Sequence, residues 1–241
     1  MKRICILDLP SPFSEAWRHA LAEKAIELGF KYLEIWGELH APLNDDADYL
    51  IVSGDVAGGA LANPTQWLVL YASPAQAIEA LSSHGEHAFW LAASRLAMGA
   101  AVLQNGGTSL DSSAQTIVVP GFGTVRREDV ITSTPAKIEA LAFYEVLPPT
   151  PGAKAVWPGE LFVIPEQERG TIRREGDPIS IAGRRRVIAH APYIELCPGE
   201  WSLRLRIKVD PQSAANIMRF EWGPGEDVVF LEHRFEKPGR Y

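Results

Sequence analysis

Two glycine-containing loops carry the residues whose positions best suit ligand binding. Ser53 and Asp55 flank a glycine directly after one short β-rich run, and Gly121 and Gly123 form a Gly-x-Gly after another. Ligands usually bind at the carboxyl ends of strands in open α/β sheets, so these four residues are candidate ligand-binding residues, with Asp55 placed to bind ribose or a metal ion. If the strands before these two loops are adjacent in the sheet, the two loops would form one site. The glycine spacing matches neither the dinucleotide fingerprint nor a phosphate-binding loop, and no clear helix follows Asp55, so a plain flexible loop is the simpler interpretation.

A second group of candidates is basic and aromatic. Residues Trp201–Val209 alternate apolar and polar side chains, which predicts a β-strand with its apolar side buried. Arg204, Arg206 and Lys208 share the polar side and could bind an anionic sugar or an acidic chain, the arginines through guanidinium forks. Tyr193 is the candidate aromatic platform for a sugar ring. The simpler alternative is that these basic side chains solvate an outer sheet face.

Other polar clusters have simpler explanations than catalysis. Residues Asn44–Asp48 contain an Asp-x-Asp, but they precede a strand and suit a solvated turn better than a cation site. His84 and His87 are three residues apart with a glycine between them, which indicates a break between helices and not a zinc site. The chain has no Gly-x-Ser-x-Gly elbow. The sequence therefore predicts no metal site, implies no cofactor and assigns no catalytic residue.

Composition and charge narrow the class of protein. A hydrophobic content of 46% with 22% charged residues is typical of a globular chain. The formal net charge of −7 argues against nucleic acid as a partner, because phosphate binding needs a basic surplus. The longest apolar region is too interrupted for a membrane span, and the apolar run at the amino terminus is too interrupted for a secretion signal. We therefore expect a cytoplasmic protein. Cys5 and Cys197 lie among apolar residues and are expected to be buried free thiols.

The first half of the chain must position the two loops, and it alternates short apolar runs with helical segments. Such runs are typical of central strands in a covered sheet, so residues 1–147 are predicted to form an α/β domain with a mostly parallel sheet and helices on both faces. The expected strands are Ile4–Leu9, Lys31–Trp36, Tyr49–Ser53, Trp67–Ala72 and Thr116–Val119. The expected helices are Glu15–Leu28 with Ser14 as its cap, a region from Pro74 to Gln104 broken near residues 82–85, and Thr134–Tyr144.

The second half follows a proline-rich linker at residues 148–158. Residues 159–241 are predicted to form an all-β antiparallel sandwich of the jelly-roll type, because turns separate short strand candidates throughout. The expected strands are Leu161–Ile164, Pro178–Ala182, Val187–His190, Tyr193–Leu196, Trp201–Val209, Ile217–Trp222 and Val228–Phe235. Residues 236–241 resemble a turn that leads into a strand the chain lacks. Either a short edge strand closes the sandwich or a longer chain supplies the missing strand, and an unpaired edge would favour a partner chain.

Two stretches resemble proteins that accompany bacterial exopolysaccharide and capsule glycosyltransferases. The first comprises Trp67–Pro74 and the later Thr116–Val119. The second, Ala191–Trp201, is similar to the strand-turn-strand pattern PY-x-x-L-x-P-G-x-[YW] of jelly-roll modules attached to such enzymes. The resemblance implies glycan-related work and carries over no catalytic residue.

Three functional hypotheses follow from these features. The first is a non-catalytic or degenerate carbohydrate-related protein that acts in cell-surface polysaccharide biosynthesis and binds a glycan. The second is a sugar-nucleotide-dependent glycosyltransferase with the Asp55 and Gly121 loops as its site. The third is an interaction module that pairs with a protein partner, or with itself, through its C-terminal sheet edge.

Overall fold

The computed structural model describes residues 1–37, 43–44, 46–132, 136–162, 187–190, 193–211, 216–223 and 228–241. The chain forms two compact units that are discontinuous in sequence. The first unit comprises Met1–Phe162 together with Ala191–Pro198, and the second comprises Val163–His190 together with Gly199–Tyr241. No helix in the described ranges is long and apolar enough to cross a membrane.

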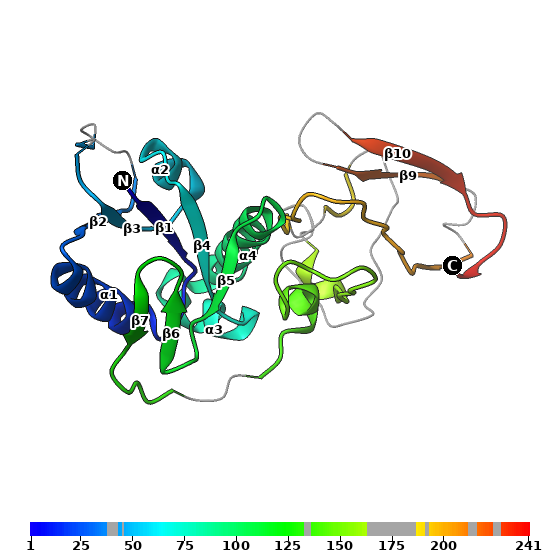
Figure 1. The fold of residues 1–241 in the computed structure, drawn as a ribbon. Helices are drawn as coiled ribbons and strands as arrows, with labels where there is room; N and C mark the ends of the chain where they lie inside the picture. The colour runs from blue at the N-terminus through cyan, green and yellow to red at the C-terminus, as the bar shows by residue number, and fades with distance from the viewer. Residues whose placement is uncertain are drawn as a thin grey trace. The chain divides into compact units, whose positions relative to one another are not determined.

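A five-stranded parallel sheet forms the centre of the first unit, in the order β2-β3-β1-β4-β5 (Figure 1). Its strands are β1 (Arg3–Asp8), β2 (Lys31–Ile35), β3 (Tyr49–Ser53), β4 (Gln66–Tyr71) and β5 (Thr108–Asp111). In the register of the sheet, Leu7 of β1 lies beside Ser53 of β3 and Val69 of β4. The predicted parallel α/β sheet is therefore confirmed, and β5 is a strand that the sequence pattern did not predict.

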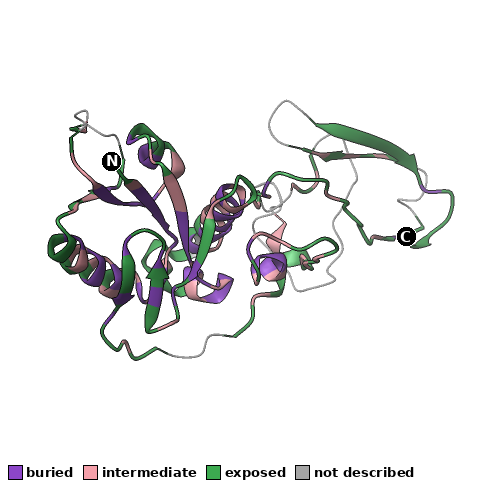
Figure 2. Cartoon of the chain, viewed as in Figure 1, coloured by how far each residue is buried: buried purple, intermediate pink, exposed green. Residues whose placement is uncertain are grey.

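Both faces of this sheet are covered, which explains why its central strands are apolar along their whole length. The helices are α1 (Ser14–Leu28), α2 (Val56–Leu61), α3 (Pro74–Ala80) and α4 (Ala88–Gln104), and the hairpin strands are β6 (Thr116–Val119) and β7 (Gly123–Arg126). On one face, Ile4 and Ile6 share a core with Trp17 of α1 and Val119 of the hairpin. On the other face, a methyl group on Gly59 of α2 would contact Cys5, and one on Gly99 of α4 would contact Val69. The buried residues accordingly gather in the sheet and on the inner sides of the helices (Figure 2).

Local signals define the helix ends of this unit. Gly29 ends α1 in a left-handed conformation with φ of 77°, which glycine adopts without steric cost. Ser73 caps α3 through a complete capping box with Gln76, as Ser73-Pro74 predicted. Ser14 was expected to cap α1, but it is the first helical residue, and its hydroxyl donates to Asp8 at 3.0 Å. The cap prediction is wrong because the Ser14 hydroxyl donates its hydrogen bond to the buried Asp8 carboxyl group.

The parallel sheet ends at β5, after which the chain folds differently from the prediction. Thr116–Val119 was predicted as a strand, and it is one, but β6 pairs with β7 in an antiparallel hairpin over one face. In place of the predicted Thr134–Tyr144 helix there is a short 3-10 helix, η2 (Glu139–Tyr144); residues 133–135 lie outside the described ranges. Residues 148–158, the expected linker, fall within the first unit, where the Trp157 indole donates to the Ala140 carbonyl at 3.1 Å.

A late segment, residues 193–198, returns to the first unit. The Tyr144 hydroxyl donates to the Glu195 carbonyl at 2.9 Å and accepts from the Cys197 backbone at 3.0 Å. Gln104, the last residue of α4, donates to the Pro198 carbonyl at 3.0 Å. These hydrogen bonds join segments that are far apart in sequence, and they leave Tyr193–Leu196 without the strand structure predicted for it.

The described strands of the second unit form two separate antiparallel pairs. β8 (Lys208–Val209) pairs with β11 (Gly239–Arg240), and β9 (Ile217–Trp222) pairs with β10 (Val229–Arg234). The last two strands confirm the predictions at 217–222 and 228–235. Leu161 ends a 3-10 turn, η3 (Gly159–Leu161), Val187–His190 contains a single bridge residue, and residues 163–164 and 178–182 lie outside the described ranges. A closed jelly-roll sandwich stays a prediction.

The strand predicted over Trp201–Val209 is wrong for its first six residues. Only Lys208 and Val209 form a ladder, and Leu203 and Leu205 on the expected buried side are 49% and 41% exposed. Alternation creates two faces, but a strand also needs a partner that supplies its hydrogen bonds. The chain end provides this partner only for Ile207–Val209: Tyr241 and Ile207 exchange backbone hydrogen bonds of 2.9 and 3.1 Å. The turn at residues 236–241 therefore does lead into a short strand.

Candidate functional site

The carboxyl edge of a parallel sheet is where α/β domains usually bind ligands, in a crevice between strands. β1 leads into α1, which covers one face, whereas β3 and β4 lead into α2 and into α3 and α4, which pack on the other. Adjacent strands whose connections leave toward opposite faces open such a crevice between them. Asp8 is the last residue of β1 and lies at this point, although it is only 4% exposed.

Asp8 is a buried carboxyl group with two polar partners. Its Oδ1 accepts from the Ser14 hydroxyl at 3.0 Å, and its Oδ2 accepts from Nη1 of Arg18 at 3.3 Å. Burial raises the pKa of Asp8 to about 6 because the loss of hydration outweighs the hydrogen bonds and the attraction of Arg18. A carboxyl group that titrates this close to neutral pH at the carboxyl edge of a parallel sheet is a candidate functional group.

Arg18 connects Asp8 to two side chains at the end of β2. Its Nε lies 3.9 Å from Oε2 of Glu34, and its guanidinium carbon lies 5.1 Å from the centre of the Trp36 ring. The Trp36 indole donates to Oε2 of Glu34 at 3.1 Å. We call Asp8, Arg18, Glu34 and Trp36 the carboxyl-edge cluster. Because Glu34 and Trp36 are two residues apart, they point to the same face of their strand.

Gly54 allows Trp36 to lie across the end of β3. A Cβ atom on Gly54 would lie 2.5 Å from the Trp36 ring, so only glycine permits this approach. Arg95 of α4 donates to the Gly54 carbonyl and fixes the same turn from the other face. The Trp36 side of the cluster is open to solvent, since this residue is 55% exposed.

Ser53 and Asp55, which the sequence marks as ligand-binding candidates, have structural roles. The Ser53 hydroxyl donates to the Asp55 carbonyl at 2.7 Å, and the Asp55 carboxylate caps α2 by accepting from the Gly58 backbone at 2.5 Å. A helix thus follows Asp55 directly, and the expectation of a plain loop is wrong. Gly58 and Gly59 are needed for close packing, because a methyl group on Gly59 would lie 2.5 Å from the Trp67 ring.

The loop of Gly121 and Gly123 lies at the opposite edge of the sheet. It forms the turn between β6 and β7, and the Gly121 carbonyl accepts from Lys2 Nζ at 3.1 Å. Lys2 precedes β1, whose six residues span about 20 Å at about 3.3 Å each. The predicted single site built from the Asp55 and Gly121 loops is therefore not formed, because β6 folds back as a hairpin instead of joining the sheet.

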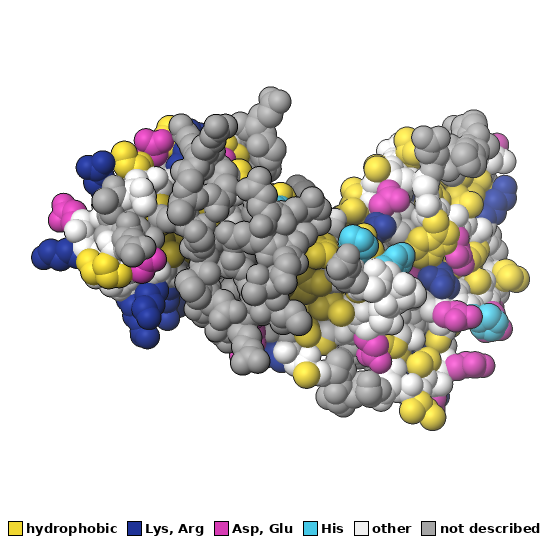
Figure 3. Space-filling view, turned by 180° about the vertical axis from the view of Figure 1, so that it is seen from behind, with side chains coloured by type: hydrophobic (Ala, Val, Ile, Leu, Met, Phe, Trp, Pro, Cys, Tyr) yellow, Lys and Arg dark blue, Asp and Glu magenta, His cyan; other side chains and the backbone are white. Residues whose placement is uncertain are grey.

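The remaining candidates fall in different units. Arg204, Arg206 and Lys208 are exposed in the second unit. Tyr193 belongs to the first unit, where it is 73% exposed with a left-handed φ of 48°. Charged side chains of both signs and apolar side chains are interspersed over the described surface of the second unit, at the left of Figure 3. The predicted basic face is thus solvated, but without the buried apolar face expected behind it.

The carboxyl-edge cluster can bind a polar ligand. The Glu34 carboxylate accepts hydrogen bonds, the Arg18 guanidinium donates them and the exposed Trp36 indole offers an apolar face, whereas the buried Asp8 orients Arg18. Sequence reasoning missed all four residues, although an aspartate that ends an apolar first strand was a usable signal. Across the described ranges, no three His, Cys, Asp or Glu side chains come together as a metal site would require.

Comparisons of the chain with protein-family models, curated proteins and solved structures found no match.

Proposed function

We propose that the chain is a non-catalytic or degenerate carbohydrate-related protein whose first unit binds a sugar or sugar nucleotide at the carboxyl-edge cluster. The observation that carries this proposal is the juxtaposition of Asp8, Arg18, Glu34 and the exposed Trp36 at the carboxyl edge of the parallel sheet. We further propose that the ligand comes from cell-surface polysaccharide biosynthesis, in line with the sequence resemblance of residues 67–74 and 191–201.

The chemistry of the cluster suits a sugar better than a simple anion. Sugar hydroxyls donate to carboxylates and accept from guanidinium groups, and the apolar side of a sugar ring can pack on an indole. Arg18 is already shared between two carboxyl groups, so its charge is largely balanced within the cluster. A ligand with many hydroxyl groups can therefore form more hydrogen bonds with this cluster than a lone phosphate can.

The glycosyltransferase hypothesis in its original form loses its geometric basis. It required Asp55 and the Gly121 loop at one site, and the structure holds them at opposite sheet edges. The Asp55 carboxylate is also occupied by the first turn of α2. Sugar-nucleotide binding nevertheless remains within the proposal, at the carboxyl-edge cluster.

Calorimetric titration tests the proposal directly. The panel comprises UDP-, GDP- and CMP-sugars with neutral and acidic oligosaccharides, each also screened for a rise in melting temperature, since a ligand of the native state must stabilise it. Trp36→Ala should weaken binding about tenfold through the lost ring contact. Val118→Ala, an exposed apolar residue on the hairpin, is the control. If no member of the panel binds, or if Trp36→Ala and Val118→Ala bind equally well, the proposed site is wrong.

A second candidate function, an interaction module, is favoured by the hairpin of the second unit. Val229, Phe230 and Leu231 of β10 are 70%, 59% and 62% exposed. An isolated two-stranded hairpin is marginally stable in water, so a partner strand would stabilise it. Light scattering across a concentration series tests self-association: a mass that rises for the wild type, but not for Phe230→Ser, is expected. A monomer at every concentration, with no partner recovered by affinity capture, would eliminate this candidate.

A further inference from the structure

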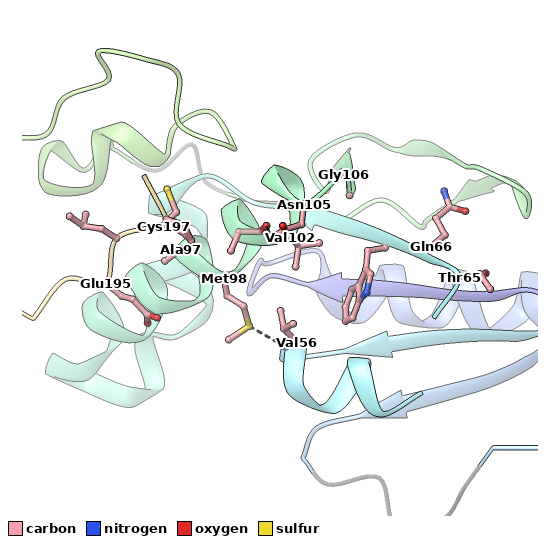
Figure 4. A pocket seen from close by; sticks show the side chains of 15 residues that line it. Val56, Thr65, Gln66, Ala97, Met98, Val102, Asn105, Gly106, Glu195 and Cys197 are labelled. Atoms are coloured by element: carbon pink, nitrogen blue, oxygen red, sulfur yellow. Dashed lines mark hydrogen bonds between the residues drawn. The ribbon is translucent and has the colours of Figure 1, made fainter. Parts of the chain in front are cut away.

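A groove of about 680 Å³ lies in the first unit, and none of the four residues of the carboxyl-edge cluster is in its described lining (Figure 4). The groove is lined by α4, by the start of α2, by the returning segment that ends at Pro198 and by Trp67. The described lining residues are Val56, Thr65, Gln66, Trp67, Ala97, Met98, Ala101, Val102, Asn105, Gly106, Gly107, Glu195, Leu196, Cys197 and Pro198. A volume of this size lies within the range of small-molecule sites, about 300–1,000 Å³.

The shape of the groove follows one side of α4. From Ala97 to Asn105 the helix advances about 12 Å at 1.5 Å per residue. Ala97 and Ala101 leave space that larger side chains would fill, and the flexible Met98 thioether accepts from the Val56 backbone at 3.3 Å. Figure 4 shows Thr65 and Gln66 at one end and Glu195 with Cys197 at the other. The groove is therefore elongated, mainly apolar along its length and polar at its ends.

The charge of the lining restricts the ligand. Glu195 is the single charged side chain among the described lining residues, and no lysine or arginine is among them. Burial raises the pKa of the Cys197 thiol, so this group stays uncharged at neutral pH. The carboxylate of Glu195 is exposed and accepts a hydrogen bond from Ser94 at 2.5 Å, which fixes it at one end of the groove. An anionic ligand would meet repulsion there, whereas an amine would be attracted.

We propose that this groove binds an elongated, mainly apolar ligand that carries an amine, with the ammonium group at Glu195 and the apolar body along Ala97, Met98 and Ala101. This site is independent of the carboxyl-edge cluster and of the sugar ligand proposed for it. The apolar body supplies most of the affinity, and Glu195 supplies the preference for a cationic head.

Three probes with the same C12 chain, used below their micelle concentrations, test the proposal: dodecylammonium, 1-dodecanol and dodecanoate. With ¹³C-methyl methionine labelling the chain gives three methyl signals, and the Met98 signal reports on the groove in the unmodified protein. We expect the Met98 signal to shift while those of Met1 and Met218 do not. Dodecylammonium should bind about two- to fivefold tighter than dodecanol, as an exposed ion pair allows, and dodecanoate should bind weakest.

Two variants and a control separate the parts of the proposal. Glu195→Gln should remove the preference for the ammonium probe without preventing dodecanol binding. Ala101→Phe fills the groove and should weaken all three probes at least about tenfold, whereas Ala57→Phe on the exposed side of α2 should not. No Met98 shift with any probe, or equal affinity for all three in the wild type, overturns the proposal. Failure of sugar binding at the carboxyl-edge cluster would leave it unaffected.

Discussion

Replacing Asp8 by asparagine should change how the stability of the first unit depends on pH. In the folded protein burial raises the pKa of Asp8 to about 6, from 3.8 for the unhindered group. Below about pH 3 the group is largely protonated in both states, and as the pH rises toward 6 the unfolded chain releases its proton first. The unfolded state is then favoured, so the free energy of unfolding falls by about 3 kcal/mol, at 1.36 kcal/mol per pKa unit. Asparagine has no such proton to lose.

The difference in unfolding free energy between Asp8→Asn and the wild type isolates this effect, because the other titrating groups cancel. The difference should rise by about 3 kcal/mol, in favour of the variant, between pH 3 and pH 7, and then level off. Urea unfolding can be followed by ¹⁹F NMR of fluorotryptophan at Trp17, which is fully buried in the first unit and reports on that unit alone. Asp129→Asn provides the comparison for an exposed carboxylate. A flat difference, or one that falls with pH, would show that the attraction of Arg18 outweighs burial and would refute the reasoning.

Three further predictions test the packing of the first unit. Gly59→Ala should destabilise the protein by about 1–3 kcal/mol in urea unfolding, because its methyl group would lie 2.5 Å from the Trp67 ring. Gly159→Ala is the control and should change stability little, because open space surrounds Gly159. Equal effects of the two substitutions would contradict the close packing of α2. Ser73→Ala removes a complete capping box and should cost about 1 kcal/mol, and Ser73→Thr should retain most of this, so a loss shared by both variants would argue against the cap. Burial raises the pKa of the Cys5 thiol to about 12 and also raises the pKa of the Cys197 thiol. Iodoacetamide at pH 8, with mass spectrometry as the readout, should therefore modify neither thiol until urea unfolds the chain. Rapid labelling of the folded protein would contradict this prediction.

The first unit was largely predictable because its signals are local. Ile4–Leu9 shows a buried strand by its continuous apolar run, and Gly29 and Ser73-Pro74 mark helix ends through conformations that those residues favour. The helix α2 was missed because two of its six residues are glycines, which normally disfavour helices. Tertiary packing explains these glycines: only a residue without a side chain fits between α2 and the sheet.

The second half was harder to predict because ladders depend on distant partners. Trp201–Val209 has a strong period-two pattern, yet the chain end pairs only with its last three residues. The same reason explains β6, whose residues suit a parallel strand but turn back at Phe122 into a hairpin. The sequence pattern predicts which side chains share a face of a segment, but only the folded structure shows which strands are its neighbours.

The candidate site was missed for a related reason. Asp8 and Glu34 look like ordinary polar ends of strands, and Arg18 like a solvated helix residue. Their significance comes from Arg18 lying between both carboxyl groups, across separations of 10 and 16 residues that no local motif encodes. The glycine loops attracted attention because their composition is unusual, but Asp55 is a helix cap and Gly121 a hairpin turn.

The return of residues 193–198 to the first unit has a consequence for how the protein is made. During synthesis a chain folds from its amino terminus as it leaves the ribosome, and domains usually fold as units. In the part of the chain that the structure describes, the hydrogen-bond partners of the Tyr144 hydroxyl belong to Glu195 and Cys197, which are translated after Val163–His190. The first unit therefore stays incomplete until residues 191–198 have been translated. A chaperone that binds nascent chains would meet it in that unfinished state, with the surface around Tyr144 still uncovered.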